Sequence, residues 1–245
     1  MYFKNKHVVI TGGANGIGRC IVENFQREGA IVTIIDVDKI AGESIENVNF
    51  YYGDIAEKSI LEDFISTLKQ PVNCLINNAC IGKKGLLSNC SYEDFDYVQR
   101  VGVTAPYYLT SLLLKNNLLA ENASIVNVAS TRAFQSQPDT ESYSAAKGGI
   151  IALTHAMAIS LSGRARVNAV SPGWIDTTNS EFSRSDKSQH PAGRVGIPRD
   201  IAEIVLFLCS EKAGFITGEN VTVDGGMSKL MIYHDDFGWR YESGM

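Results

Sequence analysis

The middle of the sequence carries three side chains, Ser130, Tyr143 and Lys147, whose types and spacing suit proton transfer at a hydroxyl or carbonyl group. Tyr143 and Lys147 lie four residues apart in a helical pattern, so their phenol and ammonium groups would share one helix face. A neighbouring cation favours the ionised phenol, and Ser130 could hold a substrate oxygen by a hydrogen bond. On its own, however, a Tyr-x-x-x-Lys spacing also arises by chance, and a serine after a strand is commonly a turn residue.

A glycine-rich segment near the start of the chain, TGGANGIG at 11–18, lies between an apolar run and an apolar-periodic stretch. Strand, glycine turn and helix in this order form a corner where a pyrophosphate can approach the amides of a helix N-terminus. The glycine spacing is GxxxGxG rather than the common GxGxxG, and an ordinary strand-to-helix turn is the alternative. The residues expected to contact a dinucleotide here are Gly12, Asn15, Gly16, Ile17 and Gly18.

The residue that ends the next apolar run is Asp36, 18 positions after Gly18. A carboxylate at this place can accept hydrogen bonds from the ribose hydroxyls of the adenosine half of a dinucleotide. It would repel the 2′-phosphate of NADP, and Asp38 adds negative charge, so the sequence predicts that NAD is preferred over NADP. The alternative is that Asp36 serves only as the N-cap of the following helix.

Polar residues also follow the third and fourth apolar runs, where Asp54 precedes Ile55 and the paired asparagines 77 and 78 precede Ala79. In a parallel sheet these strand ends would meet at one edge, so Asp54, Ile55, Asn78 and Ala79 are further candidate cofactor-binding residues. Amide side chains donate and accept at once, so the two asparagines could tie neighbouring strand ends together. A simple Asx turn explains one of them equally well.

Apolar runs rich in β-branched residues alternate with helix-length segments along the chain. The runs are 7–11, 31–36, 48–52, 72–77, 124–129, 166–171 and 220–224. Such alternation requires crossover connections and predicts an α/β fold, a three-layer doubly wound parallel sheet of about seven strands known as the Rossmann fold. We expect residues 1–245 to form one dinucleotide-binding and catalytic domain, with a substrate loop at 174–197 and a C-terminal extension at 229–245.

Composition excludes several other functions. With 22 basic and 27 acidic side chains and a net charge of −5, no basic stripe indicates nucleic acid as a partner. The chain lacks a signal peptide or a run of about 20 apolar residues, so no membrane association is expected. Five scattered cysteines without a CxxC pair favour a reducing, cytoplasmic location, and the four histidines share no metal-ligand spacing, so no metal is expected.

Several motifs together resemble those of the short-chain dehydrogenase/reductase family. They are TGGANGIG, NNAC at 77–80, Ser130 with YSAAK at 143–147, SPGWIDT at 171–177 and ITGENVTVDGG at 216–226, within a likeness that covers residues 6–228. The resemblance implies a Rossmann fold, NAD(P)-dependent interconversion of carbonyl and alcohol groups, and a homodimer or homotetramer.

The same resemblance implies a role for each matching residue. It makes Tyr143 the acid/base, Lys147 the ribose-binding residue that favours the ionised phenol, and Ser130 the group that polarises the substrate oxygen. The residues that would meet the nicotinamide end of the cofactor are Pro172, Gly173 and Thr177. The four-residue spacing from tyrosine to lysine argues against the divergent enoyl reductases, whose spacing is longer.

Three positions depart from the family pattern: Cys80 and Ala133 each replace a common glycine, and Gly102 replaces a helical asparagine that supports a water in the proton relay. Pro106 has no N–H to bond the carbonyl of Gly102, and its ring pushes that carbonyl aside. We therefore hypothesise that the freed carbonyl of Gly102 holds the relay water.

Substrate specificity is expected to come from residues that follow Ser130 and from the 174–197 loop. Arg132 could bind an anionic substrate, although a solvated or structural ion pair is the alternative, and Trp174 should approach the same pocket. The extension at 229–245 contains the aromatic residues Tyr233, Phe237, Trp239 and Tyr241. Disorder is one reading of this tail, but so much apolar surface favours docking on the body or on a neighbouring subunit.

The leading hypothesis is an oxidoreductase that transfers a hydride between NAD(H) and a small-molecule secondary alcohol or ketone, with Tyr143 exchanging the hydroxyl proton. A 3-oxoacyl (acyl carrier protein) reductase is the alternative enzyme, weakened by Asp36 because biosynthetic reduction usually draws on NADPH. A catalytically weak dinucleotide-sensing or scaffold protein is an alternative of another class. The sequence does not identify the substrate or the direction of the reaction.

Overall fold

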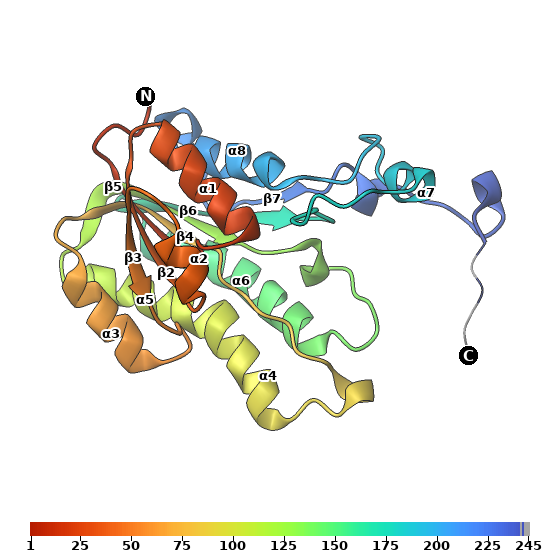
Figure 1. Ribbon diagram of the computed structural model, residues 1–245, viewed down its shortest axis with the longest axis horizontal. Helices are drawn as coiled ribbons and strands as arrows, with labels where there is room; N and C mark the ends of the chain where they lie inside the picture. Colours follow the sequence, from red (N-terminus) through yellow and green to blue (C-terminus); the bar gives the residue numbers. More distant parts are fainter. Residues whose placement is uncertain (241, 243–245) are drawn as a thin grey trace.

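The computed structural model describes residues 1–240 and 242, and its central feature is a seven-stranded sheet (Figure 1). Neighbouring strands pair in parallel throughout, in the order β3-β2-β1-β4-β5-β6-β7. The strands are β1 (His7–Thr11), β2 (Ile31–Asp36), β3 (Val48–Tyr52), β4 (Val72–Asn77), β5 (Leu119–Val128), β6 (Ala165–Pro172) and β7 (Asn220–Val223).

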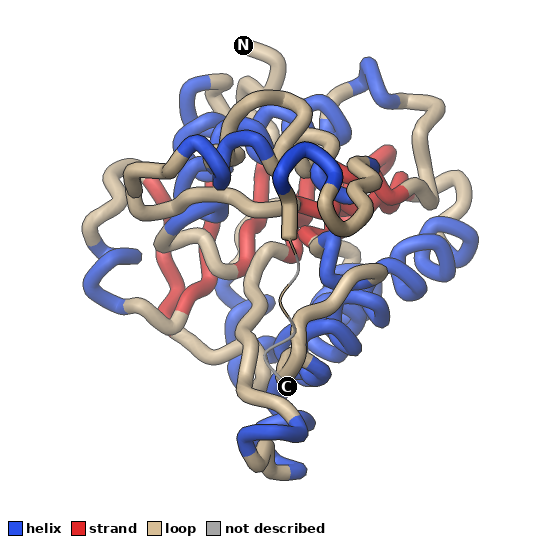
Figure 2. The backbone as a smooth tube through the Cα atoms, turned by 90° about the vertical axis from the view of Figure 1, so that its right-hand side faces the viewer, coloured by secondary structure: helices blue, strands red, loops and turns tan. Residues whose placement is uncertain are grey.

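Helices cover both faces of this sheet, which confirms the predicted three-layer, doubly wound Rossmann fold (Figures 1 and 2). The helices are α1 (Gly16–Arg27), α2 (Lys39–Glu43), α3 (Lys58–Thr67), α4 (Tyr92–Gln99), α5 (Ala105–Lys115), α6 (Glu141–Ser160), α7 (Arg184–Ser188) and α8 (Pro198–Cys209). Helices α1 and α8 pack together on one face, and α3, α4, α5 and α6 lie on the other. Within the described residues, none of the helices is both long and apolar enough to cross a membrane.

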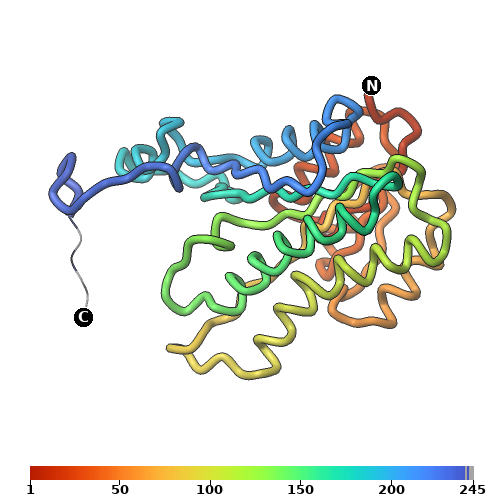
Figure 3. The backbone as a smooth tube through the Cα atoms, turned by 180° about the vertical axis from the view of Figure 1, so that it is seen from behind, coloured from red at the N-terminus to blue at the C-terminus, as the bar shows by residue number. Residues whose placement is uncertain are grey.

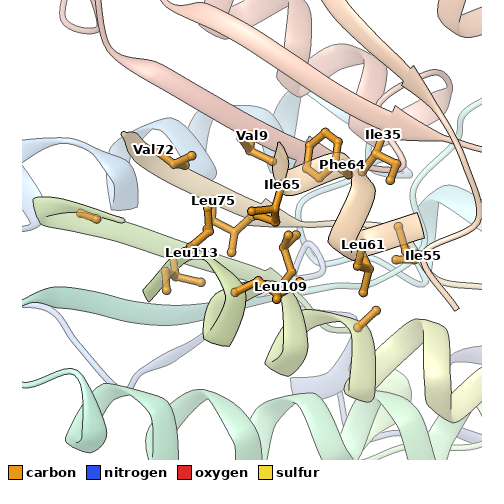
Figure 4. Packing of buried hydrophobic residues seen from close by; sticks show 14 of the residues in the cluster. Val9, Ile35, Ile55, Leu61, Phe64, Ile65, Val72, Leu75, Leu109 and Leu113 are labelled. Carbon is orange, nitrogen blue, oxygen red and sulfur yellow. The ribbon is translucent and has the colours of Figure 1, made fainter. Parts of the chain in front are cut away.

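Alternate residues of each strand supply the two halves of the core. Leu75 of β4 packs with Phe64 and Leu109 beneath α3 and α5 (Figure 4), whereas its neighbour Ile76 joins the cluster beneath α1 and α8. Each fully buried large apolar side chain contributes about 1.5–3 kcal/mol relative to an exposed one. Burial on both faces explains why these strands read as continuous apolar runs.

The strand order determines which edge of the sheet can bind a ligand. β1 lies between β2 and β4, so the connections that leave β1 and β4 run to opposite sides and open a crevice at the carboxyl ends of these strands. Figure 2 looks toward this edge, where loops cover the strand ends. The residues that follow β1, β2, β4, β5 and β6 therefore meet there, as the sequence pattern predicts.

The first four predicted strands are confirmed to the residue, while β5 begins at Leu119 rather than at 124. Leu119 pairs with Val72 before the register shifts, and Asn122 adopts a positive φ of 55°. The exposed polar pair Glu121 and Asn122 interrupts the apolar run, so the sequence pattern does not reveal this early part of the strand. β6 extends one residue beyond the predicted limits at each end, and β5 and β7 each end one residue before the predicted limit.

The C-terminal extension runs away from the sheet beyond α7 (Figures 1 and 3). Phe237 is 97% exposed, and the backbone hydrogen bonds of Asp235, Asp236 and Trp239 close small turns within the tail itself. This arrangement contradicts docking of the described tail on the body of its own chain, because the tail's aromatic groups meet solvent. Docking on a neighbouring subunit stays a prediction, and Tyr241 lies outside the described residues.

Candidate active site

The glycine turn between β1 and α1 is built for close backbone approach. Gly12 and Gly16 have φ values of +66° and +54°, a region that L side chains rarely adopt. A Cβ on Gly18 would overlap the carbonyl oxygen of Gly12, and a Cβ on Gly12 would lie 2.8 Å from Cα of Ala79. Asn15 is the N-cap of α1 but makes no side-chain cap bond, so the first amides of α1, including that of Ile17, are left for a ligand. This corner fits the pyrophosphate of a dinucleotide.

Asparagines fix the relative positions of the strand ends. The amide Nδ2 of Asn78 donates to the carbonyl of Gly12 at 2.7 Å, and the backbone amides of Asn78 and Ala79 both donate to Oγ1 of Thr11 at 3.1 Å. Deeper in the sheet, Nδ2 of Asn77 donates to Oδ1 of Asn127 at 2.8 Å, which joins β4 to β5. The prediction that the paired asparagines tie strand ends together is confirmed, and both do so rather than one making a simple turn.

Asp36 ends β2 and faces the glycine turn. Its Oδ2 accepts the backbone amide of Ala14, and its Oδ1 accepts that of Asp38, both at 2.9 Å. The N-cap of α2 is Asp38, whose carboxylate accepts from the amide of Ala41 at 3.0 Å. The N-cap alternative for Asp36 is therefore wrong, and its carboxylate is held against the expected cofactor corner.

Asp54 and Ile55 lie on the same edge but are largely engaged by the protein itself. Oδ2 of Asp54 accepts the hydroxyl of Tyr97 on α4 at 2.8 Å, and its Oδ1 accepts the amide of Ala56 at 2.9 Å. Desolvation, together with this carboxylate, raises the pKa of Tyr97 to about 12, so that phenol stays protonated. Ile55 is buried in the core, which leaves its backbone as the part able to meet a ligand.

Ser130 and Tyr143 line a single cavity of about 1010 Å³ at the carboxyl edge. Ser130 follows β5 and is the N-cap of a 3-10 helix, Thr131–Ala133, where its Oγ accepts the amide of Arg132 at 3.1 Å. Tyr143 lies in the first turn of α6. The connection from β5 to α6 thus brings together two residues that are 13 positions apart in sequence.

Lys147 shares the helix face of Tyr143, as the i to i+4 spacing predicts. Its Nζ lies 5.4 Å from the centroid of the Tyr143 ring and donates to the carbonyl of Val128 at 2.6 Å. The side chain is only 4% exposed. Because the hydrogen bond to β5 fixes the buried ammonium in place, a positive charge is held close to the ring of Tyr143.

Residues at the end of β6 and after it lie at the carboxyl edge of the sheet, and one of them, Thr177, lies beside the glycine turn. Pro172 ends β6, and the amide of the next residue, Gly173, donates to the carbonyl of Val223 at 3.0 Å. Gly173 packs closely against β7, because a Cβ on this residue would lie 2.5 Å from Cβ of Asp224. Thr177 reaches across to Gly16, since its Cγ2 would be 3.2 Å from a Cβ placed there. Thr177 therefore lies next to the predicted phosphate site. The place at the nicotinamide end, which the resemblance implies for all three residues, stays a prediction.

Trp174 borders the same cavity and packs edge-on against Phe182, with 5.3 Å between ring centroids. The 174–197 loop is irregular except for α7 and lends Asp186 and Gln189 to the cavity wall. The sequence analysis missed three cavity residues outside these segments: Gly82 and Lys83, shortly after β4, and Met227, shortly after β7. Their position after strand ends is the signal that could have found them.

Gly102 lies in a π-helical segment, Arg100–Thr104, which joins α4 to α5. The amide of Ala105 donates to the carbonyl of Arg100, and Pro106 follows directly without an N–H to offer Gly102. The helix is thus disturbed where the proline predicts it, while the role of the Gly102 carbonyl toward a water stays a prediction. A Cβ on Gly102 would lie 2.9 Å from Cβ of Ala146, so glycine permits close contact with α6.

Comparison with known proteins agrees with this geometry. A family model described as "Enoyl-(Acyl carrier protein) reductase", of the short-chain dehydrogenase type, matches residues 12–228. The chain belongs to the short-chain dehydrogenase/reductase family. Among the residues that the structure describes, no group of three or more His, Cys, Asp or Glu side chains could hold a metal ion.

Members of the family align with nearly the whole chain. An uncharacterized oxidoreductase of Thermotoga maritima is 40% identical over 95% of this chain and 99% of its own length. A 3-oxoacyl-(acyl-carrier-protein) reductase FabG of the same organism is 32% identical over 93% of this chain and 99% of its own. The solved structure of an apo SCOR enzyme from Clostridium thermocellum has a TM-score of 0.88 and 46% identity, covering 97% of this chain and 99% of that one. The protein is therefore an oxidoreductase of this family, with a nicotinamide dinucleotide as cofactor.

Proposed function

We propose that this protein is an NAD-dependent oxidoreductase that interconverts a small-molecule secondary alcohol and its ketone. The observation that carries the proposal is the placement of Ser130 and Tyr143 on one cavity, with the Lys147 ammonium 5.4 Å from the tyrosine ring. That cavity opens at the same sheet edge as the glycine turn. The four-residue spacing from tyrosine to lysine favours carbonyl and alcohol chemistry over enoyl reduction.

Oxidation of the alcohol removes a hydride from the carbon and a proton from the hydroxyl group. NAD, when bound, supplies the acceptor for the hydride. Ser130 donates a hydrogen bond that orients the substrate oxygen, and Tyr143 takes the hydroxyl proton as general base. Lys147 stabilises the negative charge that the tyrosine oxygen carries before it receives this proton. In the reductive direction Tyr143 returns the proton to the carbonyl oxygen.

The residues of the cofactor corner support binding of a dinucleotide. Gly12, Gly16 and Gly18 leave room for a pyrophosphate at α1, and Thr177 lies beside Gly16. Gly173, after Pro172, borders the cavity that Ser130 and Tyr143 line. Asp36 keeps free lone pairs on both oxygens after accepting two amides, so it can also accept ribose hydroxyls. Its charge disfavours a 2′-phosphate, which supports NAD over NADP. Equal or reversed affinities for the two cofactors, measured by calorimetry, would defeat this part of the proposal.

The Tyr143→Phe variant tests the chemistry, with Tyr92→Phe as the matched control because Tyr92 is 81% exposed at the start of α4. We expect Tyr143→Phe to lose at least a hundredfold in kcat, because the proton transfer contributes about 10²–10⁴-fold, and to retain cofactor affinity. Tyr92→Phe should match the parent protein. Full turnover by Tyr143→Phe would refute the assignment. A cofactor-dependent output that survives without turnover would instead favour the sensor or scaffold alternative.

A second candidate function is reduction of a 3-oxoacyl thioester, which the name of the FabG relative favours. Thioester and free-alcohol substrates distinguish the two functions directly. NADPH-dependent reduction of acetoacetyl thioesters that exceeds every NAD-dependent alcohol oxidation would favour the reductase.

We also propose that the protein acts as a homodimer or homotetramer. The exposed apolar side chains of the tail, among them Met231 and Phe237, support a second copy of the chain as their partner.

A further inference from the structure

We infer that Arg132 binds an anionic group of the substrate, so that the substrate is a hydroxy acid or the corresponding oxo acid. The inference rests on the proposed function and specifies the substrate class of that same cavity. The anionic group is a carboxylate, or a sulfonate or phosphate with charge of the same sign. It lies on the side of the reacting carbon that faces the Thr131–Ala133 turn.

Arg132 belongs to the same short turn as the catalytic serine. It lines the cavity with Ser130 and Tyr143, and its backbone amide donates to Oγ of Ser130 at 3.1 Å. This bond ties the backbone of Arg132 to the serine, and the contact with Gln137 orients the guanidinium. An anion that it binds is held at a fixed side of the reacting group, which is how a remote charge can orient a substrate.

The guanidinium of Arg132 has a neutral partner. Its Nη2 donates to Oε1 of Gln137, an amide oxygen that orients the group without cancelling its charge. No carboxylate among residues 1–240 and 242 forms an ion pair with it. The structural ion pair that the sequence left open for Arg132 is thus absent from the described part of the chain.

The surroundings of Arg132 differ from those of the other arginines in the described residues. Arg19, Arg100 and Arg194 pair with carboxylates at 3.0, 3.0 and 2.6 Å. Arg166 is satisfied differently, by three backbone carbonyls. Two further arginines lack a carboxylate partner in the described residues, Arg164 and Arg184, and both are exposed to water. Arg132, in contrast, is half-buried at a cavity wall.

The remaining charges around the cavity do not neutralise Arg132. Lys83 is paired with Asp94 at 3.1 Å, outside the cavity wall. The carboxylate of Asp186 forms no ion pair with Arg132 in the described residues; its Oδ2 accepts both the amide and the hydroxyl of Ser183 at the start of α7, at 2.9 and 2.8 Å. Among the described residues, Arg132 is thus the cationic residue of the cavity wall that has no ion pair, and hydroxyl and amide side chains surround it.

A planar guanidinium offers paired N–H groups that match the two oxygens of a carboxylate. In a partly desolvated cavity such a charge-assisted pair is about twice as strong as a neutral hydrogen bond. The Gln137 contact uses one of the donors and leaves others for a ligand. An acidic substrate thus gains binding that its neutral analogue lacks.

The experiment compares acids with their methyl esters, which keep the carbon skeleton and the secondary alcohol but remove the charge. Lactate, 3-hydroxybutyrate and 4-hydroxypentanoate vary the spacing between the carboxylate and the reacting carbon. We measure kcat and KM with NAD for the parent protein, Arg132→Gln, Arg132→Lys and the control Arg164→Gln, whose arginine is exposed between α6 and β6, away from the cavity.

We expect at least one acid to be preferred over its ester, and Arg132→Gln to raise KM for that acid by about tenfold to hundredfold. The ester should be unaffected by the same substitution, Arg132→Lys should restore part of the loss, and Arg164→Gln should match the parent protein. Esters or neutral thioesters used as well as the acids, or equal effects of Arg132→Gln on both, would overturn the inference while leaving the proposed function intact.

Binding provides a readout that does not need turnover. Butyrate is titrated by calorimetry into the NAD-loaded parent protein and into NAD-loaded Arg132→Gln, with methyl butyrate as the neutral probe. Butyrate binding that disappears in Arg132→Gln supports the anion site even if no alcohol in the panel is oxidised. Butyrate binding that is the same in both proteins, or absent from the parent protein, overturns it.

Discussion

Exchanging a methyl group between Gly102 and Ala146 tests the close contact of the π segment with α6. The three variants are Gly102→Ala, Ala146→Gly and the double variant that carries both changes. Ala146 is completely buried, so α6 gives its methyl group no solvent to move into. The sulfur of Cys80, 3.4 Å from the same point, can rotate away, whereas the methyl group of Ala146 is fixed to its helix backbone.

The magnitude follows from the 2.9 Å separation of the added Cβ from Cβ of Ala146. Carbon atoms pack best about 3.5–4.0 Å apart, and overpacking of this kind costs about 1–3 kcal/mol. Higher helix propensity returns at most about 1 kcal/mol, so Gly102→Ala should lower the free energy of unfolding by about 1 kcal/mol. Ala146→Gly should lower it by about 2 kcal/mol, from one lost buried methyl group and poorer helix propensity.

The double variant only moves the methyl group from one helix to the other. Additive behaviour would give a loss of about 3 kcal/mol, but we expect about 1 kcal/mol, which is a coupling energy of about 2 kcal/mol. Gly148→Ala is the control, since a Cβ there would meet only the carbonyl of Ala133, at 3.9 Å. We expect this control to be as stable as the parent or up to about 1 kcal/mol more stable.

Urea unfolding followed by circular dichroism, at one fixed protein concentration, measures all four variants. The reasoning fails if the two single effects add within about 0.5 kcal/mol, or if Gly102→Ala is as stable as Gly148→Ala. A changed slope of the unfolding transition would mean that a variant altered more than this contact.

Three further predictions concern the rest of the molecule. Burial lowers the pKa of His7, so the unfolded chain binds the proton more tightly than the folded protein does. The stability that depends on neutral His7 is therefore complete above about pH 6.5 and is lost as the pH falls below that value. Thermal unfolding between pH 8 and 5.5 should show a larger decrease for the parent than for His7→Gln, and parallel curves would contradict this. Gly18→Ala should abolish cofactor binding and destabilise the fold, because the added methyl group overlaps the Gly12 carbonyl; a normal calorimetric titration with NAD would refute it. Truncation after Ser228 should change the oligomeric state in sedimentation velocity, and an unchanged assembly and activity would count against a role for the tail.

Local patterns were enough to predict the sheet and most of the edge where the candidate site lies. The apolar run Val8–Ile10 is buried on both sides, so its strand is visible in the sequence itself. The spacing from Tyr143 to Lys147 fixes a shared helix face whatever surrounds it, and the structure places Lys147 beside the ring of Tyr143 accordingly. Such features depend on neighbours within one or two turns of chain.

The features that escaped prediction depend on contacts between distant segments. The hydroxyl of Tyr97 on α4 occupies one oxygen of Asp54, which no local pattern reveals. The glycine at 102 looks like a defect until Ala146 is packed against it. Lys83 and Met227 reach the cavity because the strand order brings the ends of β4 and β7 to one edge, and sequence periodicity does not determine that order.

The hydrogen bond from the Ala14 amide to Asp36 bears on any attempt to re-engineer coenzyme choice in this enzyme scaffold. A basic residue at position 36 would remove the repulsion of a phosphorylated ribose, but it would also withdraw the acceptor that shapes the neighbouring turn. An asparagine keeps one carbonyl oxygen for that amide while discarding the charge. A redesign toward the phosphorylated coenzyme is therefore best begun at Asp36→Asn, with positive charge introduced afterwards from the exposed Val37.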